Sequence, residues 1–495
     1  MSFFGLEIGR KAVITQQAAL NVTGHNIANA NTPGFTRQEA VLVATPPVND
    51  LTTGIGQMGT GVTIEQIRRL RDNFADAQYR KENTTAGYWA SKQEALDKVE
   101  LIINEPSDSG LRSVMDQFWV SLQKLSESPE SRAARSTVIQ SAIALAETFH
   151  HMDKQYQELQ EDLNQSVEVQ VREVNSLATQ IADLNQQILN IKVSGQEPND
   201  LYDQRDYLID QLTRLVDVQI RVEQSGLVNI YLGGRVLVHD VQAYGVIAKR
   251  DESDPRGFYN MVWAVDEQPV DLRGGSIKGL IEARGTWDGT KHTGMVPDLR
   301  QKLDALAEAI TKKMNEVHEQ GYGLDTSTGG VYEHVKLFKE PADFPGDTFV
   351  SWASFIDLNP AVRDNLDKLA AATQVETLPD GNVRGQPGDG SNALALAALK
   401  HDVTMMGNAS FDDYWRSAVA QIGVDAQEAR RMCKNQEVLL QQLDNKRQQT
   451  AGVSIDEEMT NMIRFQHAYG AAARLITAVD EMLEILISRL GVVGR

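Results

Sequence analysis

The residues of this chain that could carry out acid–base chemistry or bind a metal are its histidines and its clustered carboxylates. The nine histidines show no metal-ligand spacing, and the chain contains no HExxH motif. Asp200, Asp203 and Asp206 could form a metal site, but their spacing also fits an N-cap followed by negative charge in the first turns of a helix. We favour the helix interpretation, so the sequence predicts no catalytic residue, no cofactor and no metal site.

Other enzyme signatures are missing from the sequence as well. The glycine pairs lack the Lys-Ser/Thr of a phosphate-binding loop, and no Gly-x-Ser-x-Gly elbow occurs. The single cysteine, Cys433, excludes an intramolecular disulfide and lies in a helical pattern that predicts a buried or half-buried side chain. One alternative of another class is a peptidoglycan hydrolase inserted in residues 324–410, which contain His334, His401, Asp343, Asp347 and Asp357.

Composition and charge narrow the class of protein. The chain has 495 residues and a formal net charge of −20. An acidic chain lacks the basic surface that nucleic acid or anionic lipid requires, so we expect neither nucleic-acid binding nor docking on anionic lipid. No run of apolar residues approaches membrane-spanning length, so we expect no membrane insertion. Aromatic residues make up 6% of the chain, whereas Gln, Asn, Ala and Leu are abundant, which favours long helices. The first residues do not have the charge pattern of a cleaved signal peptide, so none is expected.

Hydrophobic residues recur at heptad spacing at both ends of the chain. This pattern forms a narrow apolar stripe that is typical of a helix with a helical partner. The alternative is two ordinary amphipathic helices packed on a globular core. We predict an interface between helices or subunits, and we expect residues 1–30 and 455–495 to be mobile in the monomer and helical in an assembly. The predicted interface residues are Leu6, Val13, Leu20, Ile27, Ile455, Met462, Phe465, Tyr469, Ile476, Val479, Leu483, Leu486 and Leu490.

Two local signals mark the inner ends of these terminal helices. Pro33 and Gly34 predict a type II turn directly after the first helix, because Pro presets φ at position i+1 and Gly supplies positive φ at i+2. Ser454 and Glu457 have the spacing of a capping box, which predicts that the last helix begins there. The whole turn motif consists of Asn26, Asn29, Asn31, Thr32, Pro33, Gly34 and Phe35.

The middle of the chain alternates between helical and extended patterns. We expect extended structure in residues 39–65, helical periodicity from about residue 66, and a long helix over 131–191 whose seam changes phase near Gln165. Strands are expected in 216–273, and helices over 276–284, over 296–318 and from about Phe411.

These patterns predict a mainly α fold with β-containing outer segments (α+β). Its parts are terminal helices in a coiled coil, a long helical bundle core, and β-rich hairpins with an insert. The predicted domains are 1–65 and 451–495 as two halves of an inner coiled coil, 66–323 as a helical core, 324–410 as an outer insert, and 411–450 as a return helix of the core.

Two strings in the sequence carry a family resemblance. The string from Ala19 to Gln38 resembles the N-terminal signature of bacterial flagellar rod, hook and hook-associated axial proteins. The string from Gly452 to Met459, with the run 466–474 that follows it, resembles the C-terminal signature of the same superfamily. The doubled acid Glu457-Glu458 and the strings 198–206 and 303–325 are more narrowly similar to the hook-associated protein 1 family. A distal rod or hook subunit is the nearer alternative, although those proteins are β-rich where this chain predicts the 131–191 helix.

The resemblance implies a structural role at the junction of the flagellar hook and filament. It implies polymerisation with other copies through the terminal helices, which would line an inner tube while the middle of the chain forms outer domains. It also implies contact with the hook protein and with a second hook-associated protein on the filament side. Export through the flagellar type III apparatus is implied, without a cleaved signal and with a chaperone bound to the C-terminal region. The expected location is therefore extracellular, in the flagellum.

Overall fold

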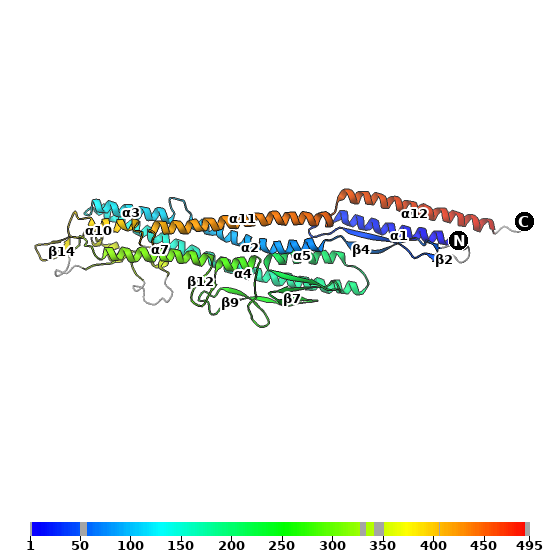
Figure 1. Ribbon diagram of the computed structural model, residues 1–495, viewed down its shortest axis with the longest axis horizontal. Coiled ribbons are helices and arrows are strands. Elements are labelled where there is room, and N and C mark those ends of the chain that lie inside the picture. The colour runs from blue at the N-terminus through cyan, green and yellow to red at the C-terminus, as the bar shows by residue number, and fades with distance from the viewer. Residues whose placement is uncertain (1, 50–56, 327–332, 341–350, 405, 491–495) are drawn as a thin grey trace.

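The chain forms an elongated rod with both of its ends at the same tip. The computed structural model describes residues 2–49, 57–326, 333–340, 351–404 and 406–490. Helices α1 (Ser2–Ala28) and α12 (Ile455–Leu490) lie side by side at one tip of the rod (Figure 1). The remaining long helices run along the rod, and the strands between residues 218 and 293 lie against one side of it. The fold is mainly α with small antiparallel sheets, which confirms the predicted fold class.

The long helices account for most of the rod. They are α2 (Asn73–Ile103), α3 (Leu111–Glu127), α4 (Arg132–Val193), α5 (Asn199–Leu215), α6 (Ser276–Arg284), α7 (Met295–His318) and α11 (Phe411–Ala451). Shorter helices are α8 (Trp352–Phe355), α9 (Pro360–Asp364) and α10 (Ser391–Ala398). None of the helices in the described residues is long and apolar enough to cross a membrane.

The strands form antiparallel pairs and one larger sheet. Strands β1 (Gln38–Ala44) and β4 (Val62–Arg69) pair beside α1, with a bulge at Val41/Leu42. The four-stranded sheet has the order β5 (Val218–Val222), β6 (Val228–Leu232), β7 (Arg235–His239) and β8 (Gln242–Ala243). The other pairs are β2 (Val48–Asn49) with β3 (Gln57–Met58), β9 (Val246–Arg250) with β10 (Tyr259–Trp263), β11 (Thr286–Trp287) with β12 (His292–Thr293), and β13 (Val375–Thr377) with β14 (Val383–Gly385). The strands expected in 216–273 are therefore confirmed.

One boundary was predicted wrongly. Helical periodicity from about residue 66 does not describe residues 66–69, because they complete strand β4. Helix α2 begins only after Asp72, whose carboxylate accepts hydrogen bonds from the backbone N–H groups of Phe74 and Ala75. Apolar residues at short spacing fit the period of a helix as well as that of a strand, and pairing with β1 decides in favour of the strand.

Helix α4 is continuous over 62 residues and changes its packing partners along its length. Its first half lies against other helices, and Ser141 hydrogen-bonds Ser121 of α3 at 2.7 Å. Its second half lies against α5, α6 and several strands: Asn164 accepts the N–H of Tyr259 at 2.8 Å, and Asn185 donates to the carbonyl of Val228 at 2.9 Å. The change of seam phase near Gln165 thus reflects a change of partner, and a break in the helix is excluded.

Residues of the 324–410 segment contribute to the same core as the long helices. Leu337, Phe338, Leu358 and Leu396 are buried in the hydrophobic cluster that also contains Phe118 of α3. The Phe118 and Phe338 rings lie 6.2 Å apart, edge to face. The described part of this segment consists mainly of short helices with the β13–β14 hairpin, so it is less β-rich than composition suggests. Asp343 and Asp347 of the hydrolase alternative lie outside the described residues.

Candidate functional site: the junction between the terminal helices and the core

The turn after α1 is built as the sequence predicts. Asn29 ends the helix by donating from Nδ2 to the carbonyl of His25 at 3.1 Å. The N–H of Phe35 donates to the carbonyl of Thr32 at 3.2 Å, and Gly34 has a φ of +80°. Both features fit a type II turn with Pro33 and Gly34 at its centre. Asn31, the remaining member of the predicted motif in this loop, is exposed.

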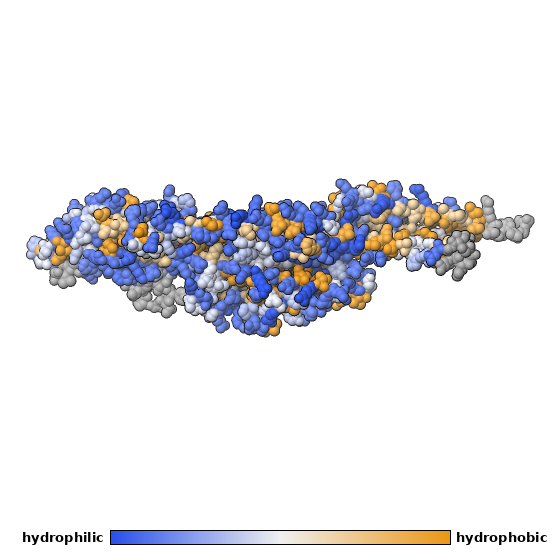
Figure 2. Space-filling model, viewed as in Figure 1, coloured by the Kyte–Doolittle hydropathy of each residue, from blue (hydrophilic) through white to orange (hydrophobic). Residues whose placement is uncertain are grey.

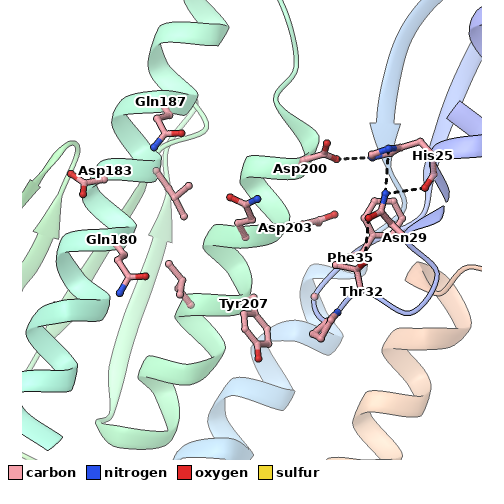
Figure 3. Close-up of a pocket in the computed structure, with 15 residues that line it drawn as sticks. His25, Asn29, Thr32, Phe35, Gln180, Asp183, Gln187, Asp200, Asp203 and Tyr207 are labelled. Carbon is pink, nitrogen blue, oxygen red and sulfur yellow. Dashed lines mark hydrogen bonds and ion pairs between the residues drawn. The ribbon is translucent and has the colours of Figure 1, made fainter. Parts of the chain in front are cut away.

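This turn rests on α5, and a cleft of about 550 Å³ separates it from α4 (Figure 3). A side chain at Gly34 has no room, because its Cβ would lie 3.0 Å from Cβ of Tyr207. His25 closes one side of the cleft: its ring lies edge-on to Phe35 at 5.3 Å, and its Nε2 is 3.2 Å from Oδ1 of Asp200. The turn is thereby fixed to the helical core as well as to α1.

Asn26 joins the end of α1 to the start of β1 and to α12. The side chain is 1% exposed and makes two hydrogen bonds with the backbone of Gln38, donating to its carbonyl at 2.8 Å and accepting its N–H at 3.0 Å. Nδ2 also donates to Oε2 of Glu458 at 3.0 Å. Because every polar atom of this buried amide is used, replacement by an apolar residue would leave several partners unsatisfied.

Arg37 connects the turn motif to the start of α12. Its guanidinium donates to Oε1 of Glu458 at 2.8 Å and to Oε2 of Glu457 at 2.9 Å. Its backbone N–H donates to the carbonyl of Ala451 at the end of α11, at 2.8 Å. The side chain of Glu458 is only 3% exposed, so its charge depends on Arg37 and Asn26 for compensation. The N-terminal and C-terminal signature strings therefore meet in one contact.

The predicted capping box is only half correct. Ser454 is the residue before α12, and its Oγ accepts the N–H of Glu457 at 3.5 Å, which is a long hydrogen bond. The carboxylate of Glu457 was expected to return to the N–H of Ser454, but it pairs with Arg37 instead. An arginine supplies a charged partner that a backbone N–H cannot match, so the ion pair replaces the second half of the box.

A cluster of four arginines and four aspartates, which we call the ionic joint, lies beside this contact. Arg71 pairs with Asp206 at 2.8 Å, and Arg80 pairs with Asp210 at 2.7 Å. Arg447 of α11 reaches Asp76 at 2.9 Å and Asp210 at 2.8 Å. The ionic joint consists of Arg69, Arg71, Arg80, Arg447, Asp76, Asp203, Asp206 and Asp210.

The turn motif is tied to the ionic joint through Asp203. Thr36 donates its backbone N–H to Oδ2 of Asp203 at 2.9 Å and its hydroxyl to Oδ1 at 2.6 Å. Arg69 donates to the same Oδ1 at 2.7 Å. Residues from the turn, β4, α2, α5 and α11 are thus held in one network, which fixes the terminal helices relative to the core.

Burial and charge act in opposite directions on the carboxylates of the joint. Burial alone would raise the pKa of Asp206, but the surrounding Arg71, Arg80 and Arg69 outweigh it and lower that pKa to about 2. For Asp203 burial dominates, and its pKa is raised despite Arg69 and Thr36. The network is electrically balanced, as a buried cluster of ions must be.

The aspartates at the start of α5 do not cap the helix. Pro198 precedes the helix and gives no side-chain cap, and only Asp200 lies in the first turn. Asp203 and Asp206 face arginines, and Asp200 accepts a hydrogen bond from Gln38 at 2.6 Å. The predicted N-cap is therefore wrong, and the arginines that Asp203 and Asp206 meet come from segments more than 120 positions away.

The heptad residues of α1, which we call the N-terminal seam, are only partly covered by the rest of the chain. Leu6, Val13, Leu20 and Ile27 are all half-buried. The face of α1 that contacts α12 most closely is formed by small residues: a Cβ at Gly9 would lie 2.7 Å from Ile476, and one at Gly5 would lie 3.2 Å from Val479. The sequence analysis missed this glycine face, and the signal that could have found it is the spacing of Gly5 and Gly9, one helical turn apart.

The C-terminal seam is divided between covered and exposed residues. Val479 is buried, and Met462, Phe465, Ile476 and Leu483 are half-buried. Ile455, Tyr469 and Leu486 are exposed in the single chain, and the side chain of Leu490 lies outside the described part. Figure 2 shows hydrophobic side chains at the surface of this tip of the rod. The role of the seam as a subunit interface stays a prediction.

Comparison with known protein families finds three matches. Residues 96–332 match the family described as flagellar hook-associated protein FlgK helical domain. Residues 6–36 match flagella basal body rod protein, and residues 446–489 match flagellar basal body rod FlgEFG protein C-terminal. The two terminal matches cover most of α1 and α12, the helices that the Asn26–Glu458 contact joins.

Similar proteins extend over the whole chain. Flagellar hook-associated protein 1 of Bacillus subtilis is 37% identical over 100% of this chain and 99% of its own length. The protein of the same name from Salmonella typhimurium is 26% identical over 95% of this chain and 97% of its own length. The structure of the flagellar hook junction protein FlgK from Burkholderia pseudomallei has a TM-score of 0.60 at 17% identity, covering 76% of this chain and 100% of that one. The last likeness supports the fold.

Proposed function

Because the chain belongs to the family of flagellar hook-associated protein 1, we propose that it is a structural subunit that joins the flagellar hook to the filament. The observation that carries this proposal is the similarity over the full length, in which the terminal helices and the helical domain occur together. The ionic joint gives the subunit a mechanical role, because it fixes the polymerising end of the rod to the outer body.

We propose that copies assemble through the paired helices α1 and α12. These helices keep large apolar side chains exposed in the single chain: Ile14 is 53% exposed and Ile463 is 51% exposed. Contiguous exposed apolar surface favours association, since burying it in a neighbouring copy removes it from water. The heptad residues that stay uncovered, such as Tyr469 and Leu486, would then be buried between subunits.

The proposed partners follow from the position at the junction. They are other copies of this chain, the hook protein on one side and a second hook-associated protein on the filament side. Export by the flagellar type III apparatus, with a chaperone at the C-terminal region, is part of the same proposal. A pull-down from cells with a tagged chain before and after export should recover the chaperone only from the cell interior.

Deletion of the gene tests the central proposal. We expect cells with hooks but no filaments, and flagellin released into the medium. Electron microscopy of the cell surface and immunoblotting of the medium give both results. Intact filaments in the deletion strain would overturn the proposal.

A second candidate is a distal rod or hook subunit, which the two terminal family matches favour because they describe rod proteins. The same deletion distinguishes it, since loss of a rod or hook subunit removes the hook itself. We further propose that the chain has no peptidoglycan hydrolase activity, and zymography of the purified chain should show no clearing.

A further inference from the structure

A groove of about 630 Å³ lies between the start of α2, helix α5 and strand β5, away from the exposed faces of the terminal helices. Arg69, Arg71 and Arg80 on its wall are paired within the ionic joint. The wall also carries Lys81 and Arg205, which form no ion pair among the described residues, and one carboxylate outside the joint, Asp217. The groove therefore has excess positive charge in a chain whose net charge is −20.

Two arginines in this groove have unused hydrogen-bond donors. Arg205 is 3% exposed and gives one nitrogen to Oδ1 of Asn185 at 3.0 Å and to the carbonyl of Gly226 at 2.8 Å, but its Nε has no partner among the described residues. Nη2 of Arg71 likewise has none. Burial lowers the pKa of Arg205 to about 10, although the neighbouring Asp206 acts in the opposite direction. Buried donors of this kind are costly unless a ligand satisfies them.

The opposite side of the groove is apolar. Val218, Ile220 and Val222 are alternate residues of β5 and share one face of the strand. Val218 and Ile220 are half-buried against the core, whereas Val222 is 69% exposed, so this face is open at its Val222 end. A small inorganic anion would leave it uncovered, and a purely apolar segment would leave Lys81 and Arg205 uncompensated.

We propose that this groove binds an acidic, aliphatic peptide segment of a partner protein, with its carboxylates toward Lys81 and Arg205 and its aliphatic side chains on Val218, Ile220 and Val222. The argument rests on charge complementarity and on the apolar face, and it is independent of the polymerisation through α1 and α12. The groove would give the body of the rod a second attachment point beside the ionic joint.

The test uses the full chain and a fluorescein-labelled peptide of alternating Glu and Val, followed by fluorescence anisotropy. We expect binding that weakens as salt is raised, because the contact is partly ionic. Lys81→Glu and Val222→Asp should each weaken binding about tenfold. Matched controls are Lys124→Glu, an exposed lysine of α3, and Val265→Asp, at a valine that is 76% exposed outside the groove; both should bind as the wild type does.

Several outcomes would overturn the proposal. They are no binding at low salt, equal binding of a peptide with Lys in place of Glu, or equal losses in groove and control variants. If the chain binds no peptide but self-associates, and Val222→Asp abolishes this self-association, the groove would instead be assigned to a second copy of the chain. Circular dichroism of all four variants checks that they fold, and each change lies at an exposed position.

Discussion

Arg37 joins the two ends of the sequence through ion pairs with Glu457 and Glu458. Arg37→Ala would leave the nearly buried Glu458 carboxylate without its cation, and breaking such a pair costs about 3–5 kcal/mol. We expect this loss in the local stability of the start of α12, where it should appear as faster hydrogen exchange of amides 455–465. The rest of the rod should keep its protection, since the ion pairs of the Arg37 side chain are with Glu457 and Glu458 at the start of α12.

Arg68→Ala is the matched control, because Arg68 lies on the neighbouring strand and pairs with Glu39 while both side chains are about half exposed. An exposed pair contributes about 0–1 kcal/mol, so exchange of the same amides should stay near the wild-type rate. Equal effects of the two substitutions would contradict the special position of Arg37.

His318 should make the core sensitive to acid. It is fully buried, its Nε2 accepts the N–H of Ala370 at 2.9 Å, and its Nδ1 lies 2.7 Å from the carbonyl of Val335, so the ring is neutral. Burial lowers its pKa to about 4, below the ordinary value of 6.5. Because the unfolded state binds the proton more strongly, the stability present above pH 6.5 is lost as the pH falls toward 4, by at most about 1.4 kcal/mol per unit.

Urea unfolding of the wild type and of His318→Gln between pH 7 and pH 4 measures this effect. The variant should be less stable at pH 7 and should lose less stability on acidification. His401→Gln, at an exposed position, should follow the wild-type curve. A wild-type and a His318→Gln curve that fall in parallel would refute the assignment.

At the scale of single residues, the sequence was sufficient to predict some residues of the junction but not their partners. The turn at Pro33 and Gly34 was predictable because its dihedral angles are set by residue type. Glu457 and Glu458 were noticed as a doubled acid, yet their pairing with Arg37 spans more than 400 positions and follows only from the topology. The second half of the capping box failed for the same reason, since a distant arginine competes with a local N–H.

At the scale of elements, the glycine face of α1 controls how closely it approaches α12. Gly9→Ala would place a Cβ 2.7 Å from Cγ1 of Ile476, so either the Ile476 side chain must move or the helices must separate. Gly24→Ala meets no atom within 4 Å and should gain up to about 1 kcal/mol from helix propensity. We therefore expect Gly24→Ala to slow, and Gly9→Ala to speed, hydrogen exchange in α1. Slower exchange in both variants would show that the close approach has no energetic importance.

The helices with long periodic patterns were predicted well, whereas an element whose bounds depend on pairing with a distant strand was not. Helices α4, α6 and α7 begin and end within two residues of the expected bounds. The β4 strand was missed in part because its pairing with β1 overrides a locally ambiguous pattern. The 324–410 segment was set apart by its composition, whereas burial of Phe338 and Leu358 depends on contacts with distant helices.

At the scale of the whole molecule, the contact between Asn26 and Glu458 changes the expected mobility of the terminal helices. The sequence alone predicts that residues 1–30 and 455–495 are mobile throughout in the monomer. The buried contacts of Asn26 and Glu458 instead favour a gradient of protection from hydrogen exchange. Amides near Asn26 and Glu458 should be protected, and protection should fall toward the far ends of α1 and α12. Hydrogen exchange of the purified monomer measures it, and uniform strong protection along both helices would contradict both expectations.

Assembly itself should depend on the seam of α12. Ile476 contacts Gly9, and Leu483 lies one heptad further toward the tip, half-buried in the single chain. Ile476→Asp or Leu483→Asp places a charge in an apolar seam without a partner, which costs several kcal/mol when neighbours close around it. We expect either variant, expressed in the deletion strain, to leave hooks without filaments, while circular dichroism shows the helical body intact. Leu101→Asp carries the same charge on a side chain of α2 that is 79% exposed, so it should restore filaments, whereas filaments of normal number with Ile476→Asp would exclude the seam from assembly.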